Sequence, residues 1–504
     1  MNTTLLDACI VGDLARVKYI LSDNRSNINS RGENNVTPVL HAAMNGHREV
    51  FDLLVREGAN LSLLDDTGLN ILHSASIGGN VEIVKYVLTQ NIMGINSRQK
   101  YGFTPAMNAA LYKRKEAFDL LVKAGADLLL MNDLEQTILH VACQGGNIVI
   151  IKYLIKREIV DIDSRDVDGW TAVMHAASDG RKDVFDVLVK AGANLSLVNS
   201  NNESILHLAC VEENVEIVKY LMKRDIVDIN SQDINGWTPI MHAVSGGHKD
   251  VFDVFLEAGA DLSHVSHKKE NILHLACDGG NTEIVKYLVK QDIVDLNSQD
   301  VNGWTPLMFA AYAGDAEVFG VLVEAGGDMS QVCNDKENIL HMACRGGNVK
   351  IVKYLLTHDI VDIDSQDEAG WTPVMHTAEE KRKDAFDLLV KWGADLSLVD
   401  GNSDNILHFG CDAGSVEIVK YLLTHNVMDI NSRNGDDCTP AMIAARKGHE
   451  AVFFLLVDHQ ADLSAVNDAG DNILNMACEG ENAQIVKYVS TRHIVEAYRE
   501  DDPC

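Results

Sequence analysis

The sequence has few positive charges for its length. Its 504 residues include 43 lysines and arginines against 74 aspartates and glutamates, which gives a net charge of -31. Binding of a nucleic-acid backbone requires clustered basic residues, so this composition excludes a general role in nucleic-acid binding. The excess of negative charge favours solubility, and it favours protein partners that carry basic segments.

Long apolar segments are also lacking. A membrane-spanning helix needs a run of about 18 apolar residues, and the sequence contains none, so no direct membrane insertion is expected. At the N-terminus, Asp7 interrupts the apolar stretch that a signal peptide would require. The expected compartment is therefore the cytoplasm, with the nucleus as the alternative.

Proline is scarce, and its placement reveals an internal repeat. Six of the seven prolines directly follow a threonine, and these threonines recur at the constant interval that separates Thr37 from Thr104, with Ala172 in place of proline at the remaining site. Halfway between them lies a second series of the type Asn-Ile-Leu-His-Leu-Ala-Cys at 271–277. Two related half-units of about 33 residues each therefore alternate along the chain. The threonines are Thr37, Thr104, Thr171, Thr238, Thr305, Thr372 and Thr439, and the isoleucines of the second series are Ile71, Ile138, Ile205, Ile272, Ile339, Ile406 and Ile473.

Each half-unit has the pattern of two short helices followed by an extended turn. Thr238 suits the N-cap of a helix and Pro239 its first turn, while Gly259 suits the left-handed residue that closes the second helix. Such units, opened by Thr-Pro at a period of about 33 residues, resemble ankyrin repeats, whose signature is Thr-Pro-Leu-His-x-Ala. The resemblance implies an all-α ankyrin-repeat solenoid in which helix-turn-helix repeats are joined by finger-like extended β-hairpin turns.

The resemblance covers essentially the whole chain. It implies a single array of about 15 repeats over 1-504: a degenerate first repeat at 3-36, thirteen full repeats at 37-470, and a capping repeat with a polar tail at 471-504. The chain departs from the family pattern because the signature histidine occurs only in alternate repeats, where His274 is typical. Methionine, such as Met241, takes its place in the Thr-Pro repeats.

The ten cysteines do not indicate a disulfide framework. Seven of them occupy one repeat position, so stacked helices would hold consecutive members about 16–20 Å apart. A disulfide needs Cα atoms within about 7 Å, which predicts small buried thiols in a reducing compartment. These cysteines are Cys9, Cys143, Cys210, Cys277, Cys344, Cys411 and Cys478.

No motif predicts catalysis, a cofactor or a metal ion. The sequence has no nucleophile elbow, P-loop, kinase set, zinc-protease helix or dinucleotide fingerprint. Consecutive signature histidines lie two repeats apart, too far to share a zinc ion, whose ligands must lie within about 2 Å of it. His264 and His267 lie closer together, but no cysteine or carboxylate set completes a site. The chain is therefore expected not to be an enzyme.

The second helix of each unit carries an alternating charge. Lysine occupies one position in every second repeat, as Lys85 and Lys152 do, and aspartate occupies it in the repeats between, as Asp52 and Asp119 do. This alternation predicts ion pairs between neighbouring helices. Exposed pairs contribute only about 0–1 kcal/mol each, so we assign them to register rather than to stability.

The row of residues just before each first helix is the candidate binding site. In proteins that this chain resembles, this position belongs to turns that face the concave groove and contact ligands. Tryptophan is favoured at interface hot spots, and carboxylates between indoles suit a segment that bears lysine or arginine. The alternative, left open here, is that each aromatic ring only packs on its own turn. The candidate partner-binding residues are Phe103, Trp170, Trp237, Trp304 and Trp371, which alternate with Glu203, Glu270, Glu337 and Asp404.

The resemblance thus implies a non-catalytic scaffold or adaptor. A protein partner with a basic or apolar segment would bind along the groove of a chain expected to be a monomer. Large arrays that resemble this one include membrane–cytoskeleton adaptors and regulatory subunits of protein phosphatases. The alternative is that the chain is an ankyrin segment or regulatory subunit of a larger signalling, phosphatase, channel or toxin assembly.

Overall fold

The computed structural model describes residues 4–23, 28–224 and 226–491. The chain divides into two compact units, Met1–Ala260 and Asp261–Cys504, and each is described by itself. The expected single array over 1-504 stays a prediction. The outer ends of its first and last repeats, including the polar tail at 498–504, lie outside the described residues.

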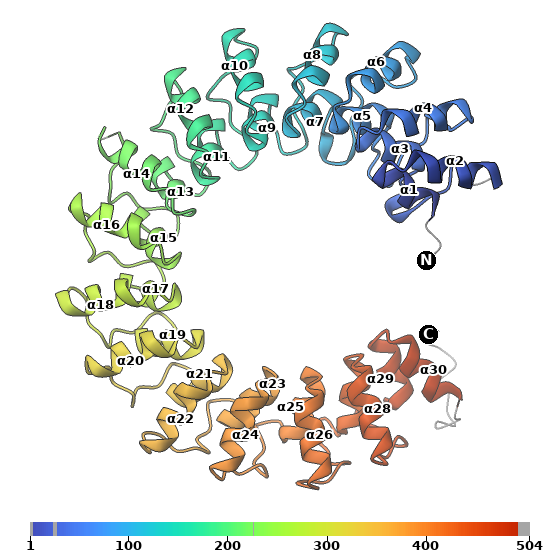
Figure 1. Ribbon diagram of the computed structural model, residues 1–504. Helices are drawn as coiled ribbons and strands as arrows, with labels where there is room; N and C mark the ends of the chain where they lie inside the picture. Colours follow the sequence, from blue (N-terminus) through green and yellow to red (C-terminus); the bar gives the residue numbers. More distant parts are fainter. Residues whose placement is uncertain (1–3, 24–27, 225, 492–504) are drawn as a thin grey trace. The chain divides into compact units, whose positions relative to one another are not determined.

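The first unit is a succession of helix pairs (Figure 1). Its odd-numbered helices pack on one another to form one layer, and its even-numbered helices form a second layer. The helices are α1 (Leu5–Val11), α2 (Leu14–Asp23), α3 (Pro38–Met44), α4 (Arg48–Arg56), α5 (Ile71–Gly78), α6 (Val81–Gln90), α7 (Pro105–Leu111), α8 (Lys115–Lys123), α9 (Ile138–Gly145), α10 (Ile148–Lys156), α11 (Ala172–Ser178), α12 (Lys182–Lys190), α13 (Ile205–Ala209), α14 (Val215–Met222), α15 (Pro239–Ser245) and α16 (Lys249–Glu257), with short 3-10 turns η2 (Glu33–Asn35) and η3 (Lys100–Gly102).

The second unit repeats the same two-layer arrangement. Its helices are α17 (Ile272–Asp278), α18 (Thr282–Gln291), α19 (Pro306–Ala313), α20 (Ala316–Glu324), α21 (Ile339–Gly346), α22 (Val349–Thr357), α23 (Pro373–Glu379), α24 (Lys383–Lys391), α25 (Ile406–Ala413), α26 (Val416–Thr424), α27 (Pro440–Arg446), α28 (Glu450–Asp458), α29 (Ile473–Glu479) and α30 (Ala483–Thr491).

The predicted fold class is confirmed. Both units are built from helix-turn-helix repeats, and over the described part of the chain the only β-structure is a set of isolated antiparallel bridges. One such bridge, between Val198 and Ser204, closes the hairpin turn that leads into α13. We call the surface formed by the hairpin turns and the odd-numbered helices the hairpin face.

The starts of the odd-numbered helices are specified locally, as the sequence predicts. Thr238 is the N-cap of α15 and Pro239 its first residue. In the other kind of repeat, Asn271 caps α17 and its side-chain oxygen accepts the backbone N–H groups of Leu273 and His274. A local start in every repeat keeps the register of the stack.

Each signature histidine links its own repeat to the next hairpin. The His140 ring is buried; its Nδ1 accepts the backbone N–H of Thr137 at 3.1 Å, and its Nε2 donates to the carbonyl oxygen of Trp170 at 3.2 Å. The histidine therefore fixes a helix start and the following hairpin together. The same 3.2 Å bond to a carbonyl joins His73 to Phe103, His207 to Trp237, His274 to Trp304 and His341 to Trp371.

Buried phenylalanines of the even-numbered helices pack on tyrosines of the next even-numbered helix. Phe185 of α12 is fully buried, and its ring meets Tyr220 of α14 edge to face with centroids 5.4 Å apart. The same contact recurs in Phe51–Tyr86, Phe118–Tyr153, Phe319–Tyr354, Phe386–Tyr421 and Phe453–Tyr488.

The predicted ion pairs between neighbouring helices are wrong for the described residues. Asp119 pairs instead with Lys115, one turn earlier on its own helix. Such i,i+4 pairs form because residues four apart share a helix face. The other pairs of this kind are Arg48–Asp52, Lys182–Asp186, Lys249–Asp253 and Lys383–Asp387.

The cysteine row has one exception. Burial raises the pKa of Cys9, where it reaches about 12. Cys478, however, is disulfide-bonded, so the prediction of a free thiol is wrong at that residue. The other members of the row are buried free thiols, as predicted: Cys9, Cys143, Cys210, Cys277, Cys344 and Cys411.

We expect acid to destabilise the fold through the signature histidines. Burial lowers the pKa of His73, His140, His207 and His341 to about 4. The unfolded chain, with histidine pKa values of about 6.5, takes up these protons first, so stability falls as the pH drops from about 6.5 towards 4. The melting temperature, measured at pH values between about 7.5 and 4.5 that span this titration, should fall with the pH.

The chain itself supplies the matched variant. Asn475 occupies the histidine position in the last repeat and accepts the Asn472 N–H at 3.0 Å. Replacing the four histidines with asparagine should lower the melting temperature at neutral pH and flatten its pH dependence. A wild-type melting temperature that stays constant over that range would contradict the assignment.

Candidate functional site

The aromatic residues of the candidate row stand at the ends of tight turns. The Asp233 carboxylate accepts the backbone N–H groups of Asn235 at 2.7 Å and Trp237 at 2.9 Å. Gly236 between them has a φ of +77°, in the left-handed region that favours glycine. The same aspartate turn holds Trp170, Trp304 and Trp371 through Asp166, Asp300 and Asp367, each at 2.8 Å.

Each tryptophan ring is partly exposed on the hairpin face and partly packed. The ring of Trp237 lies 5.1 Å from that of His242, five residues later on α15. Trp170 and Trp371 pack on histidines in the same way, at 5.0 and 5.1 Å, whereas Trp304 packs on Phe309 at 5.3 Å. One part of each ring is therefore used for packing while another part remains accessible.

The predicted carboxylates fall into two groups. Glu203, Glu270 and Asp404 are partly exposed, as is Phe103 of the aromatic row. Glu337 is instead 6 % exposed and accepts Arg345 at 3.2 Å. Glu337 therefore forms part of the wall of a site and is not a freely exposed contact.

A second set of histidines, on the helices that follow the tryptophan turns, completes the site. The sequence did not predict a role for them. His175 Nε2 lies 2.9 Å from Asp166 Oδ2, and His242 Nε2 lies 3.2 Å from Asp233 Oδ2. The signal was present as the repeated spacing Asp-x-x-x-Trp-Thr-x-x-x-His. The signature histidines are a different set. Because they match the family pattern, the interpretation of histidine in this sequence was based on them and not on this spacing.

These histidines shift the charge state of the aspartates. Burial acts to raise the pKa of Asp233, but the hydrogen bonds from His242 and from the Trp237 backbone outweigh it, so its pKa is lowered. The balance is the same at Asp166 and Asp367. Each tryptophan of these three turns thus sits on an ionised aspartate.

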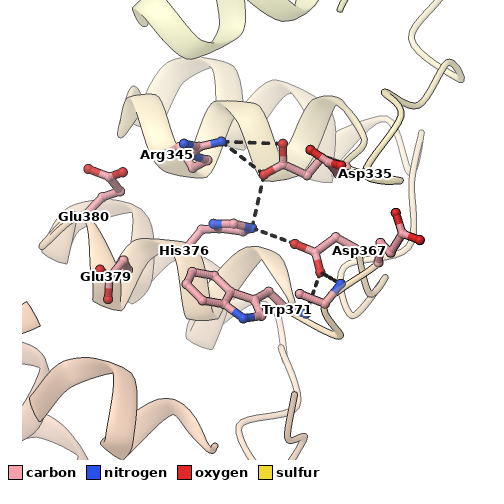
Figure 2. A pocket seen from close by; sticks show the side chains of 10 residues that line it. Asp335, Arg345, Asp367, Trp371, His376, Glu379 and Glu380 are labelled. Atoms are coloured by element: carbon pink, nitrogen blue, oxygen red, sulfur yellow. Dashed lines mark hydrogen bonds and ion pairs between the residues drawn. The ribbon is translucent and has the colours of Figure 1, made fainter. Parts of the chain in front are cut away.

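In the second unit, the tryptophan, histidine and carboxylates of one such turn line an open cavity of about 580 Å³ (Figure 2). His376 Nε2 lies 3.3 Å from Asp367 Oδ2 and 3.5 Å from Glu337 Oε1, and Arg345 donates to the same Glu337 oxygen at 3.2 Å. The Trp371 indole lies beside His376 and forms the aromatic surface of the cavity.

The remaining wall of this cavity is acidic. Glu379 and Glu380 line it from the end of α23, and Asp335 and Glu368 line it from the hairpin turns. No described lysine, arginine or histidine forms an ion pair with any of these four carboxylates. Burial, with the nearby charges of Asp412 and Glu380, raises the pKa of Glu379.

A second cavity of about 200 Å³ lies on the other side of Trp371. Phe409 contacts the indole there edge to face, with centroids 4.4 Å apart. Asp400 and Asp404 contribute carboxylates, and burial, followed by the charge of Asp404, makes the pKa of Asp400 higher than usual. The Trp371 ring is therefore shared by two neighbouring acidic cavities.

The first unit contains a corresponding cavity. It also measures about 580 Å³ and is built around Trp170 and His175, with Asp166, Asp168 and Asp179 in its wall. The two large cavities are thus equivalent places in the repeat, since Trp170 and Trp371 occupy the same position in their own Thr-containing repeats.

Two sets of side chains could hold a metal ion. Within the described residues, the ligand atoms of Glu203, Asp233 and His242 all lie within 4.8 Å of one another, and so do those of Glu337, Asp367 and His376.

The fold and the site define a helical-repeat protein that displays aromatic rings and carboxylates on a hairpin face. A model of ankyrin repeats (3 copies) matches residues 5–101, 52–132, 106–199, 188–266, 262–332, 307–400 and 393–467. The chain therefore belongs to the ankyrin-repeat family. No described helix has the length and apolar character needed to cross a membrane.

Relatives in the family differ widely in the roles that their names describe. The human "Transient receptor potential cation channel subfamily A member 1" is 26% identical over 96% of this chain and 44% of its own length. "Ankyrin repeat and KH domain-containing protein mask-1" of Caenorhabditis elegans is 30% identical over 91% of this chain and 18% of that protein. "Ankyrin repeat domain-containing protein SAT10" of Stachybotrys chartarum is 24% identical over 90% of this chain and 27% of that protein. The chain spans less than half the length of each.

We expect the aspartate turn to depend on its acceptor oxygen more than on its charge. Asn199 and Asn434 hold the same turn in other repeats, each accepting a backbone N–H at 2.9 Å. Asp367→Asn should therefore change the free energy of unfolding little, whereas Asp367→Ala should cost about 1–3 kcal/mol, because it removes the acceptor of the Ala369 and Trp371 N–H groups and each lost hydrogen bond costs about 0.5–1.5 kcal/mol. Urea denaturation compares them, and equal losses would contradict the account.

Proposed function

We propose that this protein is a non-catalytic scaffold or adaptor that binds partner proteins on the hairpin face. Ankyrin repeats mediate protein–protein interactions as a family, and the face described here adds a chemical preference. The observation that supports this most strongly is Trp371, whose indole separates two acidic cavities. An aromatic ring flanked by acidic cavities is suited to a partner segment that carries arginine or lysine.

The physical basis of the preference is the unbalanced charge around the indole. Glu379, Glu380 and Glu368 face the larger cavity without forming an ion pair with a described cationic side chain, and the net charge of the chain is -31. A guanidinium or ammonium group entering the cavity would offset this repulsion and could lie over the Trp371 ring. Cation–π contacts contribute about 0.5–2 kcal/mol, depending on their desolvation.

The rest of the row supports an extended partner. Trp170 lines an equivalent cavity in the first unit, and Trp237, Trp304 and Phe103 occupy the same place in their own repeats. A segment lying along the hairpin face of one unit would meet aromatic rings and carboxylates in alternation. The four tryptophan rings can serve both binding and packing, because one part of each contacts the side chain five residues later.

A second candidate function rests on the relatives. This chain covers 44% of the human channel and 27% or less of the two other relatives, each of which contains much more sequence. The chain would then serve as the ankyrin segment or regulatory subunit of a larger signalling, phosphatase, channel or toxin assembly. The hairpin face would act within that assembly.

The other parts of the proposal follow from composition and geometry. We infer a monomeric protein of the cytoplasm or nucleus that uses no cofactor and does not bind nucleic acid, because its charge is strongly acidic. The repeats of this family are generally non-catalytic, and we extend that property to this chain, although one relative is the "Palmitoyltransferase AKR1" of Lachancea kluyveri.

An oligo-arginine peptide tests the site directly. We expect it to bind wild-type protein and to change the tryptophan fluorescence. The double variant Glu379→Gln/Glu380→Gln should bind at least about 10-fold more weakly, because two unscreened charges near one cation each contribute about 1 kcal/mol. Trp371→Phe, which copies Phe103, should weaken binding while leaving the melting temperature nearly unchanged.

Charge-matched controls separate this site from general attraction to an acidic protein. Glu49→Gln/Glu116→Gln removes the same charge from the first turns of α4 and α8 in the even-numbered layer, and Trp392→Ala removes an indole that is 45 % exposed outside the candidate row. Neither should change the affinity by more than about twofold. Equal losses in all variants, or an oligo-glutamate peptide of the same length that binds equally well, would overturn the proposal.

A further inference from the structure

We propose that Glu203, Asp233 and His242 form a binding site for a divalent transition-metal ion of the zinc class. This inference goes beyond the proposed scaffold function, and it departs from the expectation of no metal site that the signature histidines gave. The three ligands come from three places: the hairpin before α13, the hairpin before α15, and α15 itself. An ion there would tie two successive repeats of the first unit together.

The geometry suits a tetrahedral ion. Zinc binds nitrogen and oxygen ligands at about 2.0–2.2 Å, so two of its ligand atoms lie about 3.3–3.5 Å apart. Asp233 Oδ2 and His242 Nε2 are 3.2 Å apart, and the ligand atom of Glu203 lies within 4.8 Å of both. Because Glu203 is partly exposed, a small side-chain rotation closes the third edge. The fourth position would hold water.

The outer partners of the ligands orient them towards one point. Asp233 Oδ1 already accepts two backbone N–H groups, which leaves Oδ2 directed at the imidazole. Glu203 Oε2 accepts the Asn199 amide at 2.6 Å, which leaves its other oxygen available. Hydrogen bonds of this kind orient ligands in metal sites and raise their affinity.

An internal comparison indicates that this site needs a cation. The equivalent set in the second unit, Glu337, Asp367 and His376, has its own cation, because Arg345 binds Glu337 at 3.2 Å. The repeat position of Arg345 is occupied by Val211 in the first unit, and no described lysine or arginine forms an ion pair with Glu203 or Asp233. Two carboxylates, one of them with a side chain only 2 % exposed, therefore face a single imidazole there.

Other copies of the repeat lack one ligand each, which provides natural controls. The set around Trp170 has Gln136 in place of the glutamate, with Asp166 and His175 retained. The set around Trp304 has Phe309 in place of the histidine. The complete set with no arginine occurs once among the described residues.

Zinc binding to the full chain without an affinity tag tests the proposal. We expect equilibrium dialysis against Zn²⁺ to show a bound ion that is lost in Glu203→Gln and in His242→Phe, the two changes that copy Gln136 and Phe309. Loss of an outer partner typically costs 10–100-fold in metal affinity, so loss of a ligand should cost more than about 100-fold. Co²⁺ in place of Zn²⁺ should give the visible absorption of a tetrahedral site, and the melting temperature should rise with metal.

A gain of binding makes the test independent of folding defects. Gln136→Glu completes the set with Asp166 and His175, so it should add one further bound ion. Glu116→Gln, which removes an exposed carboxylate on α8, should leave the stoichiometry unchanged. Zinc uptake that is equal in wild type, Glu203→Gln and Gln136→Glu would be adventitious binding to an acidic surface and would overturn the proposal, as would the absence of any uptake.

Discussion

The hydrogen bond from each signature histidine to the next hairpin is the constraint on which the site depends. His207 accepts the N–H of its own helix cap and donates to the carbonyl oxygen of Trp237 in the following repeat. The ring is buried and its pKa is lowered by that burial, so it is neutral and has one donor and one acceptor to place. A helix start in one repeat and an aromatic turn in the next are therefore positioned by the same side chain.

This bond explains why the chain repeats as pairs. Within each unit, hairpins also bond to the hairpin before them through the backbone, as Ile234 N–H does to the carbonyl of Asn201 at 2.8 Å. The histidine bond is added where a signature-histidine repeat precedes a Thr-containing repeat, including the one from His408 to Ser432 before the Cys438 repeat. In the aromatic repeats, Met241 fills the corresponding place and its sulfur lies 3.5 Å from the Thr238 backbone nitrogen. Since methionine has no donor, the following acidic hairpin is not held in the same way.

The sequence predicted most of the fold because the fold is specified locally. Thr-Pro pairs, cap asparagines and closing glycines each act within a few residues, so reading one repeat predicted the helices of all the others. The aromatic row was also placed correctly at the ends of the turns. The sequence did not predict that Asp119 pairs within its own helix, because opposite charges at equal height suggested a neighbour while Lys115 lay four residues away on the same face.

The wall of the site was harder to predict because it depends on contacts between repeats. His376, Asp367 and Glu337 belong to a helix and two different hairpins, and they meet only when these three elements are stacked. Their contacts change the role expected for one carboxylate of the alternating row. Glu337, predicted as a partner contact, is engaged by Arg345 and His376, so the exposed negative charge near Trp371 comes instead from Glu379 and Glu380 at the end of α23.

The same stacking divides the carboxylates of the row into those that are paired inside the protein and those that can still bind an external cation. A carboxylate that faces a histidine and an arginine, as at Glu337, is neutralised inside the protein and contributes shape to the cavity. A carboxylate that faces a histidine alone, as at Glu203, keeps an unbalanced charge that only an external cation can offset. The repeats therefore share one backbone geometry but differ in the cations that they can accept, and these differences arise from single side chains such as Val211 and Arg345 at one repeat position.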